Sequence, residues 1–455
     1  MYSFSVNGYQ YNNYNMPGST KATPVENVKK SEPARQKTAF TSNPIMSNVP
    51  FNAALSASRL RTELSSNDEV NKYNTINQNA DKNTRKLLNT LLKTGVLLNS
   101  DSNDNSTTLD NLYKIVTTPR AQGLNAQVLL KETVEAISDP HIITQQFGDI
   151  PKVYKESVSA LENGQDVNVE HSGTCPAASI EFSLAHKHPA EFARFAQGLS
   201  SPEMSVNKTI KLSNLADNTL DAIWLLNAFE IPYTAKDFDR AELKFAPDKN
   251  AIVRAHIQTV DRDRLERSSL DVLMQSTFMQ VGSQQSYDTL TDKRGGKFNQ
   301  NDKGLIEFEK TFTESVVDDK NKVSVTYQTV DENARLVGYE TDFNTMKKQI
   351  IDALNMGENI IIGYTQVDSN NIIINGHEIT IIGARFDKNG KMYLICNDTD
   401  DGVSKPIEYS EDYLLPKIHH ATFPQAVVQN EMKVTENWAE GLKNYKEMKR
   451  MRRAA

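Results

Sequence analysis

The sequence predicts an α+β fold, and three observations support this prediction. Apolar residues recur at helical spacing through much of the first half of the chain, as in NTRKLLNTLLKTGVLLN at 83–99. Short apolar segments bounded by turn residues follow later, in 323–329 and between 358 and 397. Two of them flank DKNG at 387–390, which is typical of a hairpin turn, so we expect antiparallel strands.

The helices and strands are expected in a definite order. Helical periodicity predicts helices over 83–99, 107–116, 123–138, 189–197, 217–229 and 262–281. KVSVTYQ alternates as a strand, and a helix over 341–356 places Phe343, Met346, Ile350 and Leu354 on one face, with Gly357 able to close it in the left-handed conformation. Three strands then follow, over 358–366, 376–386 and 391–397.

Composition sets limits on the class of protein. The chain has 455 residues, 38% hydrophobic and 24% charged, so part of it can bury a sizeable core. The net charge of −7 argues against nonspecific nucleic-acid binding, which needs a basic surface. No apolar run approaches the roughly 20 residues of a membrane-spanning helix. Oligomeric state is left open.

Two cysteines in the whole chain exclude a disulfide scaffold and favour a reducing compartment. The N-terminal stretch MYSFSVNGYQ lacks the basic-then-apolar order of a secretory signal. We therefore expect a cytoplasmic location, or export without a cleaved signal peptide.

Patterning divides the chain into four regions. Residues 1–82 are rich in Asn, Ser, Thr and Lys and predict a disordered N-terminal tail. Residues 83–159 predict a helical region. Residues 160–430 form the expected main domain, with a polar insert near 240–330. Residues 431–455 place apolar side chains at helical spacing before the basic run KRMRR, which predicts a C-terminal helix.

Cys175, in the stretch GTCPAAS, is the first candidate for chemistry. Pro176 is suited to the first turn of a helix, and the apolar spacing continues beyond it, so Cys175 falls near a helix N-terminus. Free backbone N–H groups and the helix dipole favour a thiolate there, and the thiolate is the nucleophile. A small buried apolar side chain is the alternative interpretation.

Among eight histidines, His377 is the best placed to act as a base. It follows Gly376 and opens the strand EITIIGARF, whereas most of the others lie in polar surroundings. The following strand ends in Asn397 and Asp398, and the hairpin brings that end close to His377. An amide or a carboxylate there would orient the imidazole. Because neighbouring residues on a strand point to opposite faces, only one of the two can serve.

These segments resemble the papain-like cysteine peptidases, including the bacterial branch with the bacteriocin-processing peptidases. GTCPAAS with its following helix matches the start of that fold, and MKKQIIDALNMGENIIIGY, GHEITIIGARF and YLICND match its C-terminal half. The resemblance covers residues 160–425 at most. It implies a helix that carries the nucleophile Cys175, an antiparallel sheet that carries the base His377, and an orienting Asn397, as in papain, or Asp398, as in the bacterial branch. We favour Asn397 of the two.

The chain departs from that family pattern in three places. His377 follows Cys175 by 377 − 175 = 202 residues, beyond the roughly 130–150 of papain-like order, and the insert near 240–330 would account for this. Val169 stands where the family has an oxyanion-binding Gln, so Asn168 or Gln165 would have to substitute. No Trp follows the orienting residue.

The resemblance implies a thiol-dependent hydrolase that cleaves peptide or isopeptide bonds in a peptide or protein substrate, without a cofactor. Two alternatives stay open: an inactive binding or scaffold protein with this fold, and an acyl transferase or deamidase of the transglutaminase type. No metal site is expected, since the pair His419–His420 is interpreted as packing near the end of the domain.

Overall fold

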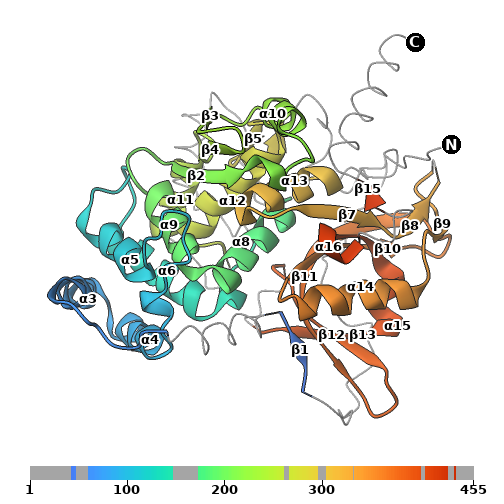
Figure 1. Cartoon of the computed structure of the whole chain (residues 1–455), viewed down its shortest axis with the longest axis horizontal. Coiled ribbons are helices and arrows are strands. Elements are labelled where there is room, and N and C mark those ends of the chain that lie inside the picture. The colour runs from blue at the N-terminus through green and yellow to red at the C-terminus, as the bar shows by residue number, and fades with distance from the viewer. Residues whose placement is uncertain are drawn as a thin grey trace.

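The structure is a computed structural model that describes residues 43–47, 60–146, 173–260, 266–295, 304–331, 333–400, 405–428 and 435–436. It has an α+β fold, as predicted, with a helical half and a half built on an antiparallel sheet (Figure 1). None of the helices in these ranges is long and apolar enough to cross a membrane.

The helical half contains most of the helices. They are α3 (Asn67–Asn79), α4 (Lys82–Lys93), α5 (Thr108–Thr117), α6 (Ala126–Ser138), α8 (Cys175–Lys187), α9 (Pro189–Leu199), α10 (Thr219–Ala228), α11 (Ala251–Val260), α12 (Ser269–Gly282) and α13 (Glu307–Asp318). Short 3-10 turns lie at η1 (Val96–Leu98), η2 (Pro140–Ile142) and η3 (Leu212–Asn214). A small sheet orders β2 (Val206–Lys211), β4 (Arg240–Phe245) and β3 (Tyr233–Ala235), and β5 (Tyr287–Asp288) pairs with β6 (Lys293–Arg294).

The main sheet is antiparallel throughout its described pairings. Its strands, in spatial order, are β13 (Ile407–Ser410), β12 (Met392–Asn397), β11 (Ile373–Phe386), β10 (Ile360–Val367), β14 (Ile418–Pro424), β7 (Lys322–Thr326) and β15 (Thr435–Glu436). β1 (Ile45–Met46) also pairs with β11, and β8 (Gln328–Val330) pairs with β9 (Leu336–Tyr339) beside this sheet. The remaining elements are α14 (Phe343–Asn355), α15 (Glu411–Leu414), α16 (Gln425–Val428) and η4 (Leu415–Lys417).

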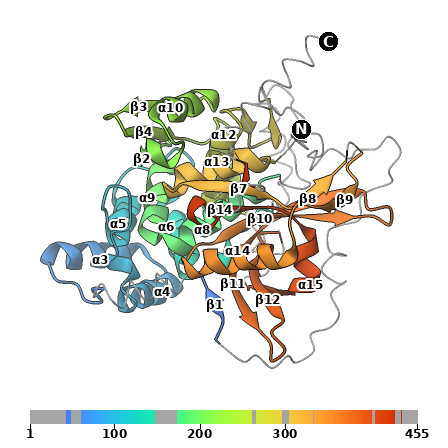
Figure 2. The same cartoon turned by 45° about the vertical axis from the view of Figure 1, so that its right-hand side comes forward.

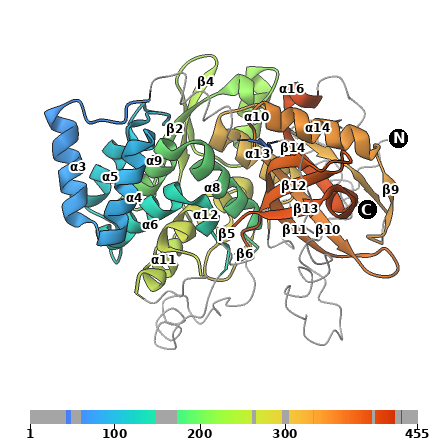
Figure 3. The ribbon, with the colours of Figure 1, turned by 90° about the horizontal axis from the view of Figure 1, so that it is seen from below.

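The sheet separates two hydrophobic cores, because successive side chains on a strand point to opposite faces. On β10, Ile361 joins the core of the helical half, whereas Ile360 and Ile362 join the core that packs on α14. The same alternation continues on β11 and β12. Figures 2 and 3 show the helical half on one side of the sheet and α14 on the other.

The segment from 341 to 397 confirms the sequence prediction closely. α14 is followed by Gly357 in the left-handed conformation, with φ of 81°, as a helix C-terminus favours. The hairpin between β11 and β12 turns at Gly390, with φ of 80°. α4, α5, α6, α9 and α10 also form where helices were predicted.

The predicted disordered tail extends too far, because α3 lies inside it. This helix exposes a mainly polar surface and buries only Ile76 completely. Its N-cap Ser66 accepts a hydrogen bond from the Glu69 N–H, and Lys72 pairs with Asp110 of α5 at 2.9 Å. A helix held by its cap and by ion pairs leaves little apolar periodicity in the sequence.

The prediction of a polar insert near 240–330 is wrong at α12, because this helix is buried along its whole length. Its N-terminus is closed by a reciprocal pair of hydrogen bonds between Ser268 and Asp271. Polar side chains such as Gln275 are buried with hydrogen-bond partners, so their polarity did not indicate exposure. The helix predicted over 431–455 lies outside the described residues except at Thr435–Glu436, which form β15 instead.

Candidate active site

Cys175 is the first residue of α8, as the sequence predicted. Its N-cap is Thr174, whose side chain makes no capping hydrogen bond to the helix. The Thr174 hydroxyl instead donates to Oε1 of Gln275 at 2.9 Å, and the Gly173 N–H donates to Oδ2 of Asp292 at 2.8 Å. The thiol is half-buried at the start of the helix, where backbone N–H groups and the helix dipole favour negative charge.

Gln275 of α12 holds the nucleophile's helix in place, and the sequence did not indicate this role. Its Nε2 donates to Oε2 of Glu181 at 3.0 Å and to the Thr144 carbonyl at 2.9 Å. Burial, with the charge of Asp271 adding to it, raises the pKa of Glu181 well above its usual range. Gln275 therefore connects Thr174, the residue before Cys175, with Glu181 of α8 and the Thr144 carbonyl through buried hydrogen bonds.

His377 lies on β11 opposite Tyr364 of β10, and its ring meets the Tyr364 ring edge-on at 5.7 Å. Its Nε2 is 2.8 Å from Oδ1 of Asp398, with the His377 side chain 10% exposed and the Asp398 side chain 1% exposed. The Cys175 side chain also lies near enough to the imidazole to help raise the pKa of His377. Since Nε2 faces Asp398, Nδ1 is the nitrogen available to the thiol.

The electrostatic balance favours a protonated imidazole. Burial is the largest single influence on His377 and opposes the charged form. The negative charge of Asp398, its hydrogen bond, and the interactions with Cys175 together outweigh it, so the pKa of His377 lies well above its usual value. An imidazolium beside Cys175 would in turn stabilise a thiolate there.

The structure brings Asp398, not Asn397, to His377, so our preference for Asn397 was wrong. The cause is a bulge in β11: Ile381 pairs with Cys396, but Gly383 pairs with Ile395. This shift places Asn397 opposite Thr380, on the face of the sheet away from His377. Oδ1 of Asn397 instead lies 2.7 Å from Nδ1 of His141.

A segment after α6 braces the turn that carries Asp398. The Gln145 N–H and the Thr144 hydroxyl both bond the Thr399 carbonyl, each at 3.0 Å. Gln146 donates to the carbonyl and carboxylate of Asp400, and the Asp400 N–H donates to Oδ1 of Asp398 at 3.0 Å. Backbone and side-chain hydrogen bonds from the helical half therefore hold in place the turn that carries Asp398, the partner of His377.

No family model matches this sequence, and no curated protein or solved structure compared with it is significantly similar.

The remaining predicted residues fall into two groups. Gln165 and Asn168, the expected oxyanion donors, lie outside the described residues. Cys396 forms no disulfide bond and is buried in the core between the sheet and α14, as expected of a structural residue.

Proposed function

We propose that the chain is a papain-like thiol hydrolase that cleaves peptide or isopeptide bonds. The observation that carries the proposal is a set of three groups: Cys175 at a helix N-terminus, His377 near enough for Cys175 to help raise its pKa, and Asp398 with Oδ1 at 2.8 Å from Nε2 of the imidazole. A nucleophile, a base and an orienting group in that order are the arrangement required for covalent acyl transfer.

In the proposed reaction, His377 holds the proton of Cys175 and the thiolate attacks the substrate carbonyl carbon. The tetrahedral intermediate collapses as His377 gives its proton to the leaving amine, which breaks the C–N bond and leaves a thioester. A water molecule then gives a proton to His377 and attacks the thioester, which releases the acid and restores the thiol proton to the Cys175–His377 pair. Asp398 fixes the ring through each proton transfer.

The first test is selective alkylation by iodoacetamide. We expect Cys175 to react faster than a free thiol at mildly acidic pH, because the imidazolium stabilises its thiolate. Cys396 is the internal control, since its side chain is fully buried. The His377→Ala variant should lose the excess rate. Equal rates for Cys175 and a free thiol at every pH would instead support the inactive scaffold.

Asp398 gives a specific reason to test acyl transfer as well, because the transglutaminase-like group also uses Cys, His and Asp. The acyl-enzyme of Cys175 should be trapped with a glutamine-containing peptide library and identified by mass spectrometry. Cleaved peptide bonds indicate a peptidase. Retained backbones with deamidated side chains, or with added amines attached, indicate a deamidase or transferase.

A further inference from the structure

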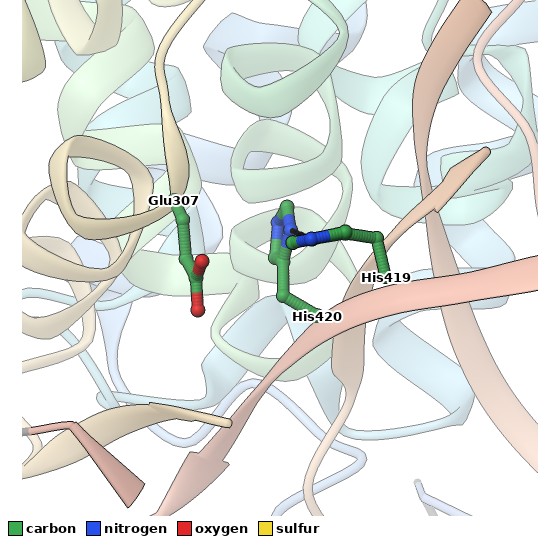
Figure 4. A group of neighbouring side chains, drawn as sticks. All are labelled: Glu307, His419 and His420. Atoms are coloured by element: carbon green, nitrogen blue, oxygen red, sulfur yellow. Dashed lines mark hydrogen bonds between the residues drawn. The ribbon is translucent and has the colours of Figure 1, made fainter. Parts of the chain in front are cut away.

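Two neighbouring histidines of β14 point to the same side of the sheet. In a regular strand, His419 and His420 would face opposite sides. Here Gly363 of β10 pairs with His420 and Tyr364 pairs with Ile418, so His419 is the extra residue of a bulge. The Nδ1 atoms of the two rings consequently lie 3.0 Å apart, and both side chains are buried (Figure 4).

Gly363 makes room for this arrangement. A Cβ atom at this position would lie 2.3 Å from Cε1 of His420, closer than any ordinary contact. Gly363 also pairs with Glu378 of β11 on its other side. Because Gly363 has no side chain, Glu378 and His420 meet above it, with Oε1 of Glu378 3.0 Å from Nε2 of His420.

Glu307, the first residue of α13, brings a carboxylate to the same place. One ligand atom of Glu307, one of His419 and one of His420 all lie within 4.8 Å of one another (Figure 4). The hydroxyls of Ser324 and Thr326, on the adjacent strand β7, both donate to Oε1 of Glu307. These two hydrogen bonds therefore orient the Glu307 carboxylate in the structure.

We propose that Glu307, His419 and His420 form a binding site for a divalent transition-metal ion, with Zn²⁺ as the best match. Two imidazole nitrogens and one carboxylate oxygen are a donor set that zinc accepts. In a tetrahedral zinc site, ligand distances of about 2.0 Å put two nitrogens roughly 3.3 Å apart, close to the observed 3.0 Å. Glu307 would have to approach by about 1.5 Å at most, a distance that a side-chain rotation can supply.

The surroundings have the features of a second coordination shell. A carboxylate that accepts the outer N–H of a metal-binding histidine fixes the tautomer that presents the other nitrogen to the metal, and Glu378 stands in that position. Lys310 lies 3.2 Å from Glu378 and opposes a cation. The carboxylates of Glu307 and Glu378 carry two negative charges, and Lys310 carries one positive charge. One net negative charge therefore remains for the metal ion to neutralise.

The competing explanation is that the two Nδ1 atoms simply share a hydrogen bond and bind no metal. A measurement of metal binding distinguishes this explanation from the proposal. The test uses the full chain with Cys175→Ala, so that the cysteine site cannot bind the metal. After treatment with a chelator, Zn²⁺ and Co²⁺ are titrated in turn by calorimetry and by visible absorption. We expect one equivalent of each, and a tetrahedral Co²⁺ spectrum without a thiolate charge-transfer band.

Glu307→Gln and His419→Gln should each weaken binding at least tenfold. His256→Gln is the matched control, because His256 lies on α11, outside the proposed site, and its Nδ1 is 2.6 Å from the Gly123 carbonyl. The affinity of this variant for the metal should equal that of the parent chain. Circular dichroism establishes that each variant is folded. If a variant fails to fold, the Co²⁺ spectrum of the parent chain decides alone. Binding of less than one equivalent there, an octahedral spectrum, or unchanged affinity in both folded site variants would overturn the proposal.

Discussion

Replacing Asp398 with Asn tests the proposed site most directly. The change keeps the size of the side chain but removes the charge that faces Nε2 of His377. Both groups are almost fully buried, and a hydrogen bond to a charged group contributes about 1.5–3 kcal/mol. Because about 1.4 kcal/mol corresponds to a factor of ten in an equilibrium constant, losing this interaction should lower the pKa of His377 and weaken its ion pair with the Cys175 thiolate roughly 10- to 100-fold.

The sign of the pH effect follows from the raised pKa of His377. The imidazolium persists above pH 6.5, so its contribution to the stability of the folded state is fully present below that pH and is lost as pH rises through the folded-state pKa. At mildly acidic pH the same imidazolium supports the thiolate of Cys175. Asp398→Asn weakens that support, so it should move the acid limb of the rate of Cys175 alkylation to higher pH and slow that rate roughly 10- to 100-fold at mildly acidic pH.

Asn397→Ala is the matched control, since Asn397 is buried beside Asp398 but faces His141. It should lower stability by about 1 kcal/mol through one lost hydrogen bond and leave the acid limb in place. Iodoacetamide rates measured across pH compare both variants with the parent chain. An acid limb that moves with Asn397→Ala but not with Asp398→Asn would refute the assignment of Asp398 as the orienting group.

Three further substitutions probe the scaffold by urea denaturation and circular dichroism. Gln275→Leu should lower the free energy of unfolding by about 1–3 kcal/mol, because it leaves buried polar groups unpaired; an unchanged denaturation midpoint would contradict this. Gly363→Ala should cost about 1–3 kcal/mol by displacing the ring of His420, and a neutral effect would mean that the ring moves freely. Lys310→Met should cost about 3–5 kcal/mol by leaving Glu378 buried without its cation, and a stabilised variant would show that the pair is dispensable.

The sequence predicted the segments around the site well, because the signals there are local. Pro176 after Cys175 indicates a helix start, and Gly357 and Gly390 occupy positions where the backbone needs positive φ. The distance between Cys175 and His377 in space could only be inferred from the resemblance. Periodicity does not determine how two remote segments approach one another.

The choice between Asn397 and Asp398 shows where local reasoning fails. A regular hairpin from the turn at Gly390 would pair Asn397 with Ile381 and so place it on the face of His377. One bulge at Ile381–Gly383 exchanges the faces of the sheet to which Asn397 and Asp398 point. Such a bulge has no strong sequence signal, and the one in β14 that joins His419 to His420 was missed for the same reason.

The short strand β1 constrains the order in which parts of this chain can fold. Ile45 pairs with Ala384, which lies 384 − 45 = 339 residues further along, and Ser47 bonds Asn359 through its hydroxyl at 2.7 Å. During synthesis, residues 43–47 emerge long before either partner exists. The final docking of the N-terminal segment must therefore wait for the C-terminal strands, and contacts this remote in sequence form slowly.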